Sequence, residues 1–92
     1  MDDKTTIGQI RAWGKKSRKE RNWHPDARSI AISLVLESGE LLEHFQWDGE
    51  VKEKREEMKL EVADILYYLV MFADREEIDL TNVFKRKLKK IL

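Results

Sequence analysis

Four carboxylates lie in two apolar segments of the chain, and each pair of them is spaced for one face of a helix. Glu37 and Glu40 are three residues apart, as are Glu61 and Asp64, and residues at this spacing share a helix face. If a turn near Gly49 returns the chain antiparallel, the two pairs lie at similar heights, roughly 14 to 22 Å from the turn at 1.5 Å per residue. We therefore expect the four side chains to face one another.

Four acids that converge between apolar helices favour a divalent cation. Each acid would bear a desolvation penalty of several kcal/mol besides its repulsion from the others. Oxygen ligands select Mg²⁺ or Mn²⁺ over zinc when cysteine and suitably spaced histidine are absent. A ferritin-like di-iron centre requires Glu-x-x-His, and the residue three before His44 is Leu41. The alternative is that the acids are solvated or paired with lysine and arginine, as most exposed acids are.

The elements that position these acids are expected to be helices. The chain has one proline and four glycines, no alternating stretch typical of a half-buried strand, and several windows with the 3.6-residue period. We predict an all-α fold. Its four helices are expected from Thr5 or Thr6 into the basic run 15–21, from about 26–29 to Trp47, from about Val51 to Arg75, and from Asp79 or Thr81 onward.

Length and apolar patterning indicate one domain, residues 1–92, that associates with itself. A chain of 92 residues holds one core and alone buries only about 60–65% of its unfolded surface. The second and third expected helices are apolar nearly all round, so each must be covered on more than one side. We predict a homodimer or a dimer of dimers.

Composition argues against nucleic acid and membrane as partners. Eighteen basic and eighteen acidic residues cancel, which leaves no global field to hold a polyanion such as DNA. The longest uncharged apolar run, residues 65–73, is too short to span a bilayer, and the first residues lead into no signal-peptide core. Since cysteine is also absent, we expect a cytoplasmic protein.

The segments around the four acids resemble the MazG-like nucleoside triphosphate pyrophosphohydrolases. Residues 33–47 read SLVLESGELLEHFQW and residues 61–69 read EVADILYYL. Together they are similar to the family signature of ExxE, a spacer and ExxD, and here 20 residues separate the two motifs. The likeness extends from about Ile7 to Leu88 and implies a four-helix MazG-like bundle.

The resemblance also implies an activity and the residues that serve it. In such an enzyme Mg²⁺, or Mn²⁺ as a substitute, binds the triphosphate, and a metal-activated water attacks the α-phosphorus. The products are a (d)NMP and pyrophosphate, in a house-cleaning or nucleotide-pool role. The implied catalytic metal ligands are Glu37, Glu40, Glu61 and Asp64. The implied substrate-binding residues are Trp47, Tyr68, His24 and Lys87.

Two other functions stay open at this point. A phosphoribosyl-ATP pyrophosphohydrolase shares the fold and the acidic helices, although the Phe-Gln-Trp at residues 45–47 favours the MazG-like branch. A non-catalytic helical interaction module is the second alternative. Four intact acids argue against it, because an idle scaffold gains nothing from keeping them.

Overall fold

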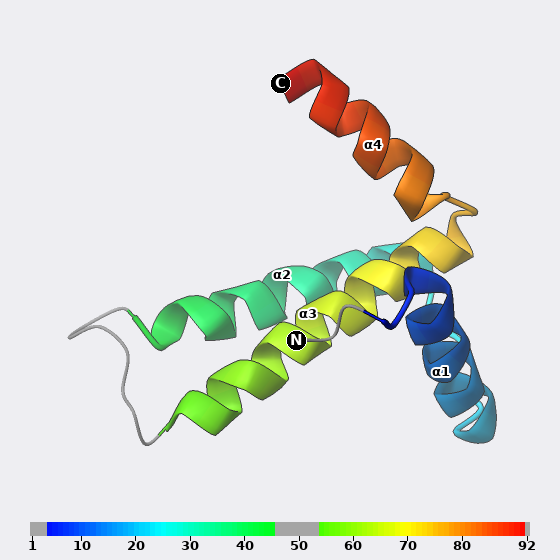
Figure 1. Ribbon diagram of the computed structural model, residues 1–92. Helices are drawn as coiled ribbons and strands as arrows, with labels where there is room; N and C mark the ends of the chain where they lie inside the picture. Colours follow the sequence, from blue (N-terminus) through cyan, green and yellow to red (C-terminus); the bar gives the residue numbers. More distant parts are fainter. Residues whose placement is uncertain (1–3, 46–53, 92) are drawn as a thin grey trace.

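Helices make up all the regular structure that the computed structural model describes, over residues 4–45 and 54–91 (Figure 1). These ranges contain no strand, which confirms the expected all-α class for the described residues. None of these helices is long and apolar enough to cross a membrane. In chain order they are α1 (Ile7–Glu20), α2 (Ala27–Glu43), α3 (Arg55–Arg75) and α4 (Leu80–Ile91).

Side-chain caps begin three of the helices where the sequence places them. Thr6 Oγ1 accepts a hydrogen bond from the Gln9 N–H at 3.1 Å, and Gln9 Oε1 accepts one from the Thr6 N–H at 2.8 Å, which forms a capping box. Asp26 and Asp79 each accept a hydrogen bond from the backbone N–H three residues later, at 2.7 and 3.0 Å. The hydrogen bonds from Ser29 lower the pKa of Asp26. The caps fix where these helices begin.

α2 ends earlier than the sequence predicts. We expected this helix to continue to Trp47, but it ends at Glu43, so that prediction was wrong. His44 and the residue after it form a turn, in which their N–H groups bond to carbonyls three residues back at 3.2 and 3.0 Å. Such tighter bonds satisfy the last carbonyls of a helix and close it. Trp47, the expected turn near residue 49 and the expected helix start at Val51 lie outside the described residues.

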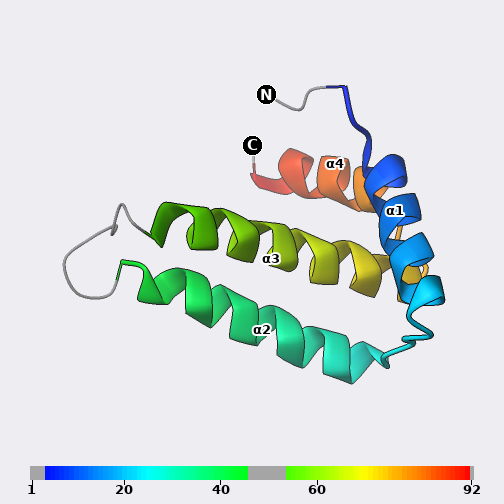
Figure 2. The same cartoon turned by 90° about the horizontal axis from the view of Figure 1, so that it is seen from below.

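α2 and α3 lie side by side and run antiparallel (Figures 1 and 2). α1 packs against α3, whereas α4 makes few contacts with the other helices and rises away from the α2–α3 pair in Figure 1. Within one chain, α4 therefore stays outside the arrangement that the other three helices form.

The fully buried core is small and lies toward one end of the α2–α3 pair. Its residues come from the beginning of α2 and the last turns of α3. Nearer the other end of the pair, apolar side chains such as Val35 and Leu60 remain 70% and 66% exposed. The half of the pair that carries the four acids is therefore thinly covered. The buried apolar residues are Ile30, Val70, Met71 and Ala73.

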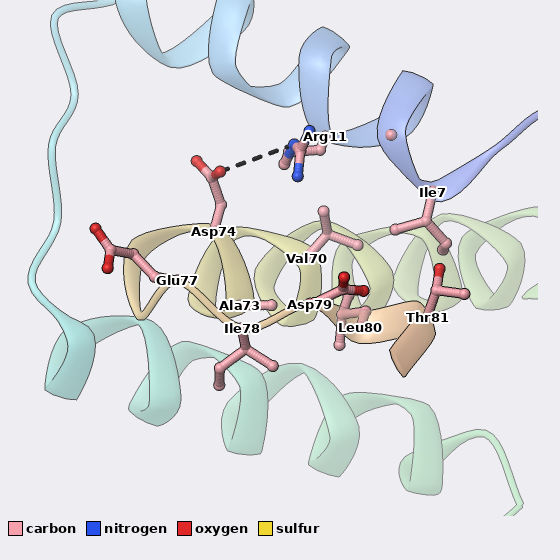
Figure 3. A pocket seen from close by; sticks show the side chains of 11 residues that line it. Ile7, Arg11, Val70, Ala73, Asp74, Glu77, Ile78, Asp79, Leu80 and Thr81 are labelled. Carbon is pink, nitrogen blue, oxygen red and sulfur yellow. Dashed lines mark ion pairs between the residues drawn. The ribbon is translucent and has the colours of Figure 1, made fainter. Parts of the chain in front are cut away.

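Asp74 joins α1 to the end of α3 that holds this core. Its carboxylate lies 3.6 Å from the Arg18 guanidinium, 3.9 Å from that of Arg11 and 4.0 Å from the Lys15 ammonium. The pair with Arg18 is the least exposed of the three, so solvent screens it least. Figure 3 shows Arg11 and Asp74 on the wall of a cavity of about 460 Å³ between α1, the end of α3 and the beginning of α4.

Candidate functional site

The structure brings the four acids of the sequence motif to one place, between α2 and α3. Burial raises the pKa of Glu37 above its ordinary value, and the negative charges of Glu40 and Asp64 raise it further. A hydrogen bond shared with Glu40 and the charge of Glu61 act in the same direction. Because these are short-range effects, the acids lie within electrostatic reach of one another. We call Glu37, Glu40, Glu61 and Asp64 the carboxylate site.

Two oxygens of the carboxylate site are buried without a hydrogen-bond partner. They are Glu37 Oε2 and Glu61 Oε2, although both residues are only half-buried as a whole. A buried, ionised oxygen without a donor is strongly destabilising. A proton or a cation removes that penalty, and burial raises the pKa of Glu37 in the direction that favours its protonated form.

His44 approaches Glu61 from the C-terminal end of α2. Its Nε2 lies 2.6 Å from Glu61 Oε2, and the two side chains are only 7% and 18% exposed. This contact is not a hydrogen bond in the structure, where Glu61 Oε2 is buried without a hydrogen-bond partner. The contact is therefore an ion pair at hydrogen-bond distance when the imidazole is protonated. Sequence reasoning missed this contact, although His44 lies four residues after Glu40 and thus on the same helix face.

The carboxylate site fits a hard divalent cation in donor chemistry and in location. Carboxylate oxygens are the ligands that Mg²⁺ and Mn²⁺ prefer, and two of them are buried here without a hydrogen-bond partner. In the part of the chain that the structure describes, no three His, Cys, Asp or Glu side chains are arranged as a ready coordination sphere. The side chains would have to draw together to share one ion.

An aromatic cluster includes Tyr68, one helical turn after Asp64 on α3. Tyr68 follows Asp64 by four residues, and its ring lies 5.9 Å from that of Tyr67 and 6.3 Å from that of Trp23. Trp23 stacks on Tyr67 at 6.5 Å, and the Arg21 guanidinium lies 5.5 Å from the Trp23 ring and 3.4 Å from the Tyr67 hydroxyl. Sequence reasoning singled out Tyr68 but missed the other two rings. Aromatic faces of this kind can stack on a nucleobase.

The other expected substrate residues lie apart from the four acids or outside the described ranges. His24 follows α1, with its Nε2 3.2 Å from Asn22 Oδ1, and lines a cavity of about 690 Å³ together with Trp23 and basic residues of α1. Lys87 lines an apolar cavity of about 510 Å³ between α3 and α4. Trp47 falls among the residues that are not described. Roles for these three residues stay predictions.

Fold and site together define a class of helical proteins in which acids from two antiparallel helices lie between those helices. Comparison with known families narrows this class. The sequence model of the MazG-like family matches residues 32–92. This range contains all four acids and most of the chain. This chain belongs to the MazG-like family.

The chain is also similar in sequence to dCTP pyrophosphatases of mammals. The chain is 36% identical over 85 residues to dCTP pyrophosphatase 1 of Homo sapiens, an alignment that covers 82% of the chain and 50% of the relative. It is 31% identical over 93 residues to dCTP pyrophosphatase 1 of Rattus norvegicus and 34% identical over 93 residues to that of Bos taurus. These two alignments cover 90% of the chain and 55% of each relative. The chain thus spans about half the length of the curated relatives it matches.

Proposed function

We propose that this chain is a Mg²⁺-dependent nucleoside triphosphate pyrophosphohydrolase that converts a (d)NTP to a (d)NMP and pyrophosphate. The observation that carries the proposal is the carboxylate site, where four acids from two helices meet and two buried oxygens lack partners. Membership of the MazG-like family supports the same activity. In this proposal the carboxylate site holds the cation.

The protein's own groups have defined tasks in such a reaction. Glu37, Glu40, Glu61 and Asp64 would hold a divalent cation, which would supply charge neutralisation for the triphosphate and a more acidic water. The carboxylate of Glu37 would be one of the ligands of that cation, through an Oε2 that is buried without a hydrogen-bond partner. The ring of Tyr68, in its cluster one helical turn after Asp64, can support the base and so orient the α-phosphorus.

A deoxycytidine nucleotide is the first substrate to test, because the relatives are dCTP pyrophosphatases. The assay measures pyrophosphate release from a panel of NTPs and dNTPs with Mg²⁺, and anion-exchange chromatography identifies the nucleotide product. We expect a nucleoside monophosphate and pyrophosphate to appear together. Orthophosphate and a nucleoside diphosphate as first products would contradict cleavage between the α- and β-phosphates.

A matched pair of variants on α3 ties the activity to the carboxylate site. Glu61→Gln removes one charge at nearly constant shape and should abolish turnover, because the acids act together on one cation. Glu56→Gln makes the same chemical change at an exposed residue that pairs with Lys59 at 2.8 Å, and it should retain activity. Equal activity in the two variants would separate catalysis from the carboxylate site.

Self-association belongs to the same proposal. Val35, Leu36, Leu42 and Leu60 are each more than 60% exposed on the single chain, and contiguous apolar surface of this kind marks an interface. We infer a homodimer or a dimer of dimers in which a second chain covers the exposed parts of α2 and α3. Light scattering at micromolar concentration tests this, and a mass near the 11.0 kDa of one chain would contradict it.

A further inference from the structure

His44 is an ionisable group inside the carboxylate site that the reaction described above does not use. Its imidazole is 7% exposed, and its Nε2 lies 2.6 Å from Glu61 Oε2. Its backbone N–H bonds to the Leu41 carbonyl at 3.2 Å in the turn that closes α2. Both the backbone and the side chain of His44 are therefore held where α2 meets α3.

The position of His44 on α2 sets which acid it can reach. Glu37, Glu40 and His44 follow one another at spacings of three and four residues, so they share the face of α2 that looks toward α3. Because the helices are antiparallel, a residue nearer the end of α2 lies opposite a residue nearer the beginning of α3. His44 accordingly meets Glu61, whereas the charge of Asp64 acts more strongly than that of Glu61 on Glu37.

We propose that His44 is a positioning residue for the carboxylate site, which restrains the Glu61 side chain between α2 and α3 before a divalent cation binds. This inference rests on the proposed function, because it assigns a partner to one of the proposed metal ligands. It extends that function by naming a residue outside the four acids on which metal affinity depends.

The physical reason is the freedom of the Glu61 side chain. A glutamate has several rotatable bonds, and fixing them when a cation binds costs conformational entropy. A contact that fixes the side chain beforehand removes part of that cost, and ligating carboxylates in metal sites usually have such an outer partner. The Glu61 oxygen near His44 has no other partner among the described residues. Among the described residues, His44 is thus placed to restrain Glu61.

Binding of Mn²⁺, measured by electron paramagnetic resonance as loss of the free-ion signal, tests the proposal without relying on turnover. Mn²⁺ is the probe because it takes the same oxygen ligands as Mg²⁺. Loss of an outer partner weakens metal binding by about 10- to 100-fold, so His44→Leu should bind Mn²⁺ at least about 10-fold more weakly than the parent. His44→Gln keeps a polar N–H group near the position of Nε2, which can contact Glu61 in place of the imidazole, and should recover most of the affinity. Glu43→Gln, at the exposed neighbouring residue, should bind as the parent does.

Each outcome of this titration either supports or contradicts the positioning role of His44. Parent-like affinity in His44→Leu would overturn the proposal, as would tighter binding, which would mean that His44 competes with the cation. Equally weak binding in the Leu and Gln variants would also overturn it, because packing of the ring and not its polar contact with Glu61 would then be responsible. If circular dichroism shows that His44→Leu does not fold, His44→Asn, whose amide is too short to reach Glu61, replaces it in the comparison.

The same titration distinguishes failure of this inference from failure of the proposed function. If the parent binds Mn²⁺ and Glu61→Gln binds it weakly, the carboxylate site stands, and the His44 variants alone decide the positioning role. If the parent binds no Mn²⁺, both the metal site and the role of His44 are wrong.

Discussion

Replacing Glu37 with Gln should leave the metal-free protein at least as stable as the parent and should reduce its stabilisation by Mg²⁺. Glu37 is the acid of the carboxylate site whose charged form is disfavoured both by burial and by neighbouring negative charges. Burial and the charges of Glu40 and Asp64 raise its pKa, and its Oε2 is buried without a partner. Gln removes the charge at nearly constant shape, so it relieves repulsion but weakens metal binding.

The sign of the pH dependence follows from linkage between protonation and folding. A carboxyl whose pKa is higher in the folded than in the unfolded state binds its proton more tightly when the protein is folded. The stability that Glu37 contributes is therefore fully present below its ordinary pKa of 4.5 and is lost as the pH rises through the raised folded value. The advantage of Glu37→Gln over the metal-free parent should grow across this window and level off above it.

The size of the metal effect follows from mass action. At ten times the Kd, a cation that binds only the folded state raises the free energy of unfolding by about 1.4 kcal/mol. For a domain of this length that corresponds to a rise in Tm of about 6–11 °C. If loss of one ligand weakens binding about tenfold, the same Mg²⁺ concentration stabilises the variant by only about 0.4 kcal/mol, or about 2–3 °C.

Thermal melts followed by circular dichroism, in EDTA and in Mg²⁺, provide the test. Ionic strength is held fixed so that general screening is not mistaken for site binding, and protein concentration is held fixed because association also shifts Tm. Glu43→Gln, an exposed acid on the same helix, is the matched control and should respond to Mg²⁺ as the parent does. Equal responses of the parent and Glu37→Gln would refute the idea that the four acids share a cation.

Three further predictions concern the fold and use the same melts in EDTA. Ile30→Val removes one methyl group from a side chain that is 1% exposed and should lower the free energy of unfolding by about 0.5–1.5 kcal/mol. Ile32→Val, at 50% exposure, should change it by less than about 0.5 kcal/mol. Equal losses in the two variants would place the core elsewhere. Glu77→Gly should raise Tm, because Glu77 has a φ of 55°, a conformation that costs a residue with a side chain about 1 kcal/mol. The control Glu76→Gly, at a φ of −91°, should lower Tm. A rise in Tm for Glu76→Gly would contradict this explanation. Asp74→Asn should lower Tm by an amount that shrinks at high salt, because three cations share its carboxylate; a salt-independent loss would argue against an electrostatic anchor.

Local signals in the sequence were enough to predict where α1 and α2 begin and that Glu37 and Asp64 lie close together. The caps at Thr6 and Asp26 need only residues within one turn, and both form as expected. The meeting of Glu37 with Asp64 needs only helical spacing and an antiparallel return, and the structure confirms both. These features depend on period and short-range hydrogen bonding, which a sequence displays directly.

Features that depend on side-chain packing between distant segments were not predictable in this way. The aromatic cluster joins Trp23 to two tyrosines more than 40 residues later, and no periodic signal links them. The contact of His44 with Glu61 depends on where α2 ends, and the sequence placed that end at Trp47, four residues too late. A helix boundary is set by the balance of competing hydrogen bonds in its last turn, so helical period alone did not locate it.

The buried core and the proposed carboxylate site are located in different halves of the α2–α3 pair. The buried residues and the Asp74 anchor lie toward the end where α2 begins and α3 finishes, while the mutually repelling acids lie where exposed apolar side chains leave the pair thinly covered. A cation and a second chain would therefore both stabilise the same half, which the core of one chain does not reach. On this view Ile30→Val should lower stability equally with and without Mg²⁺, because it changes only the other half. Glu37→Gln should alter mainly the response to Mg²⁺, since distant and independent sites contribute additively to the free energy of unfolding.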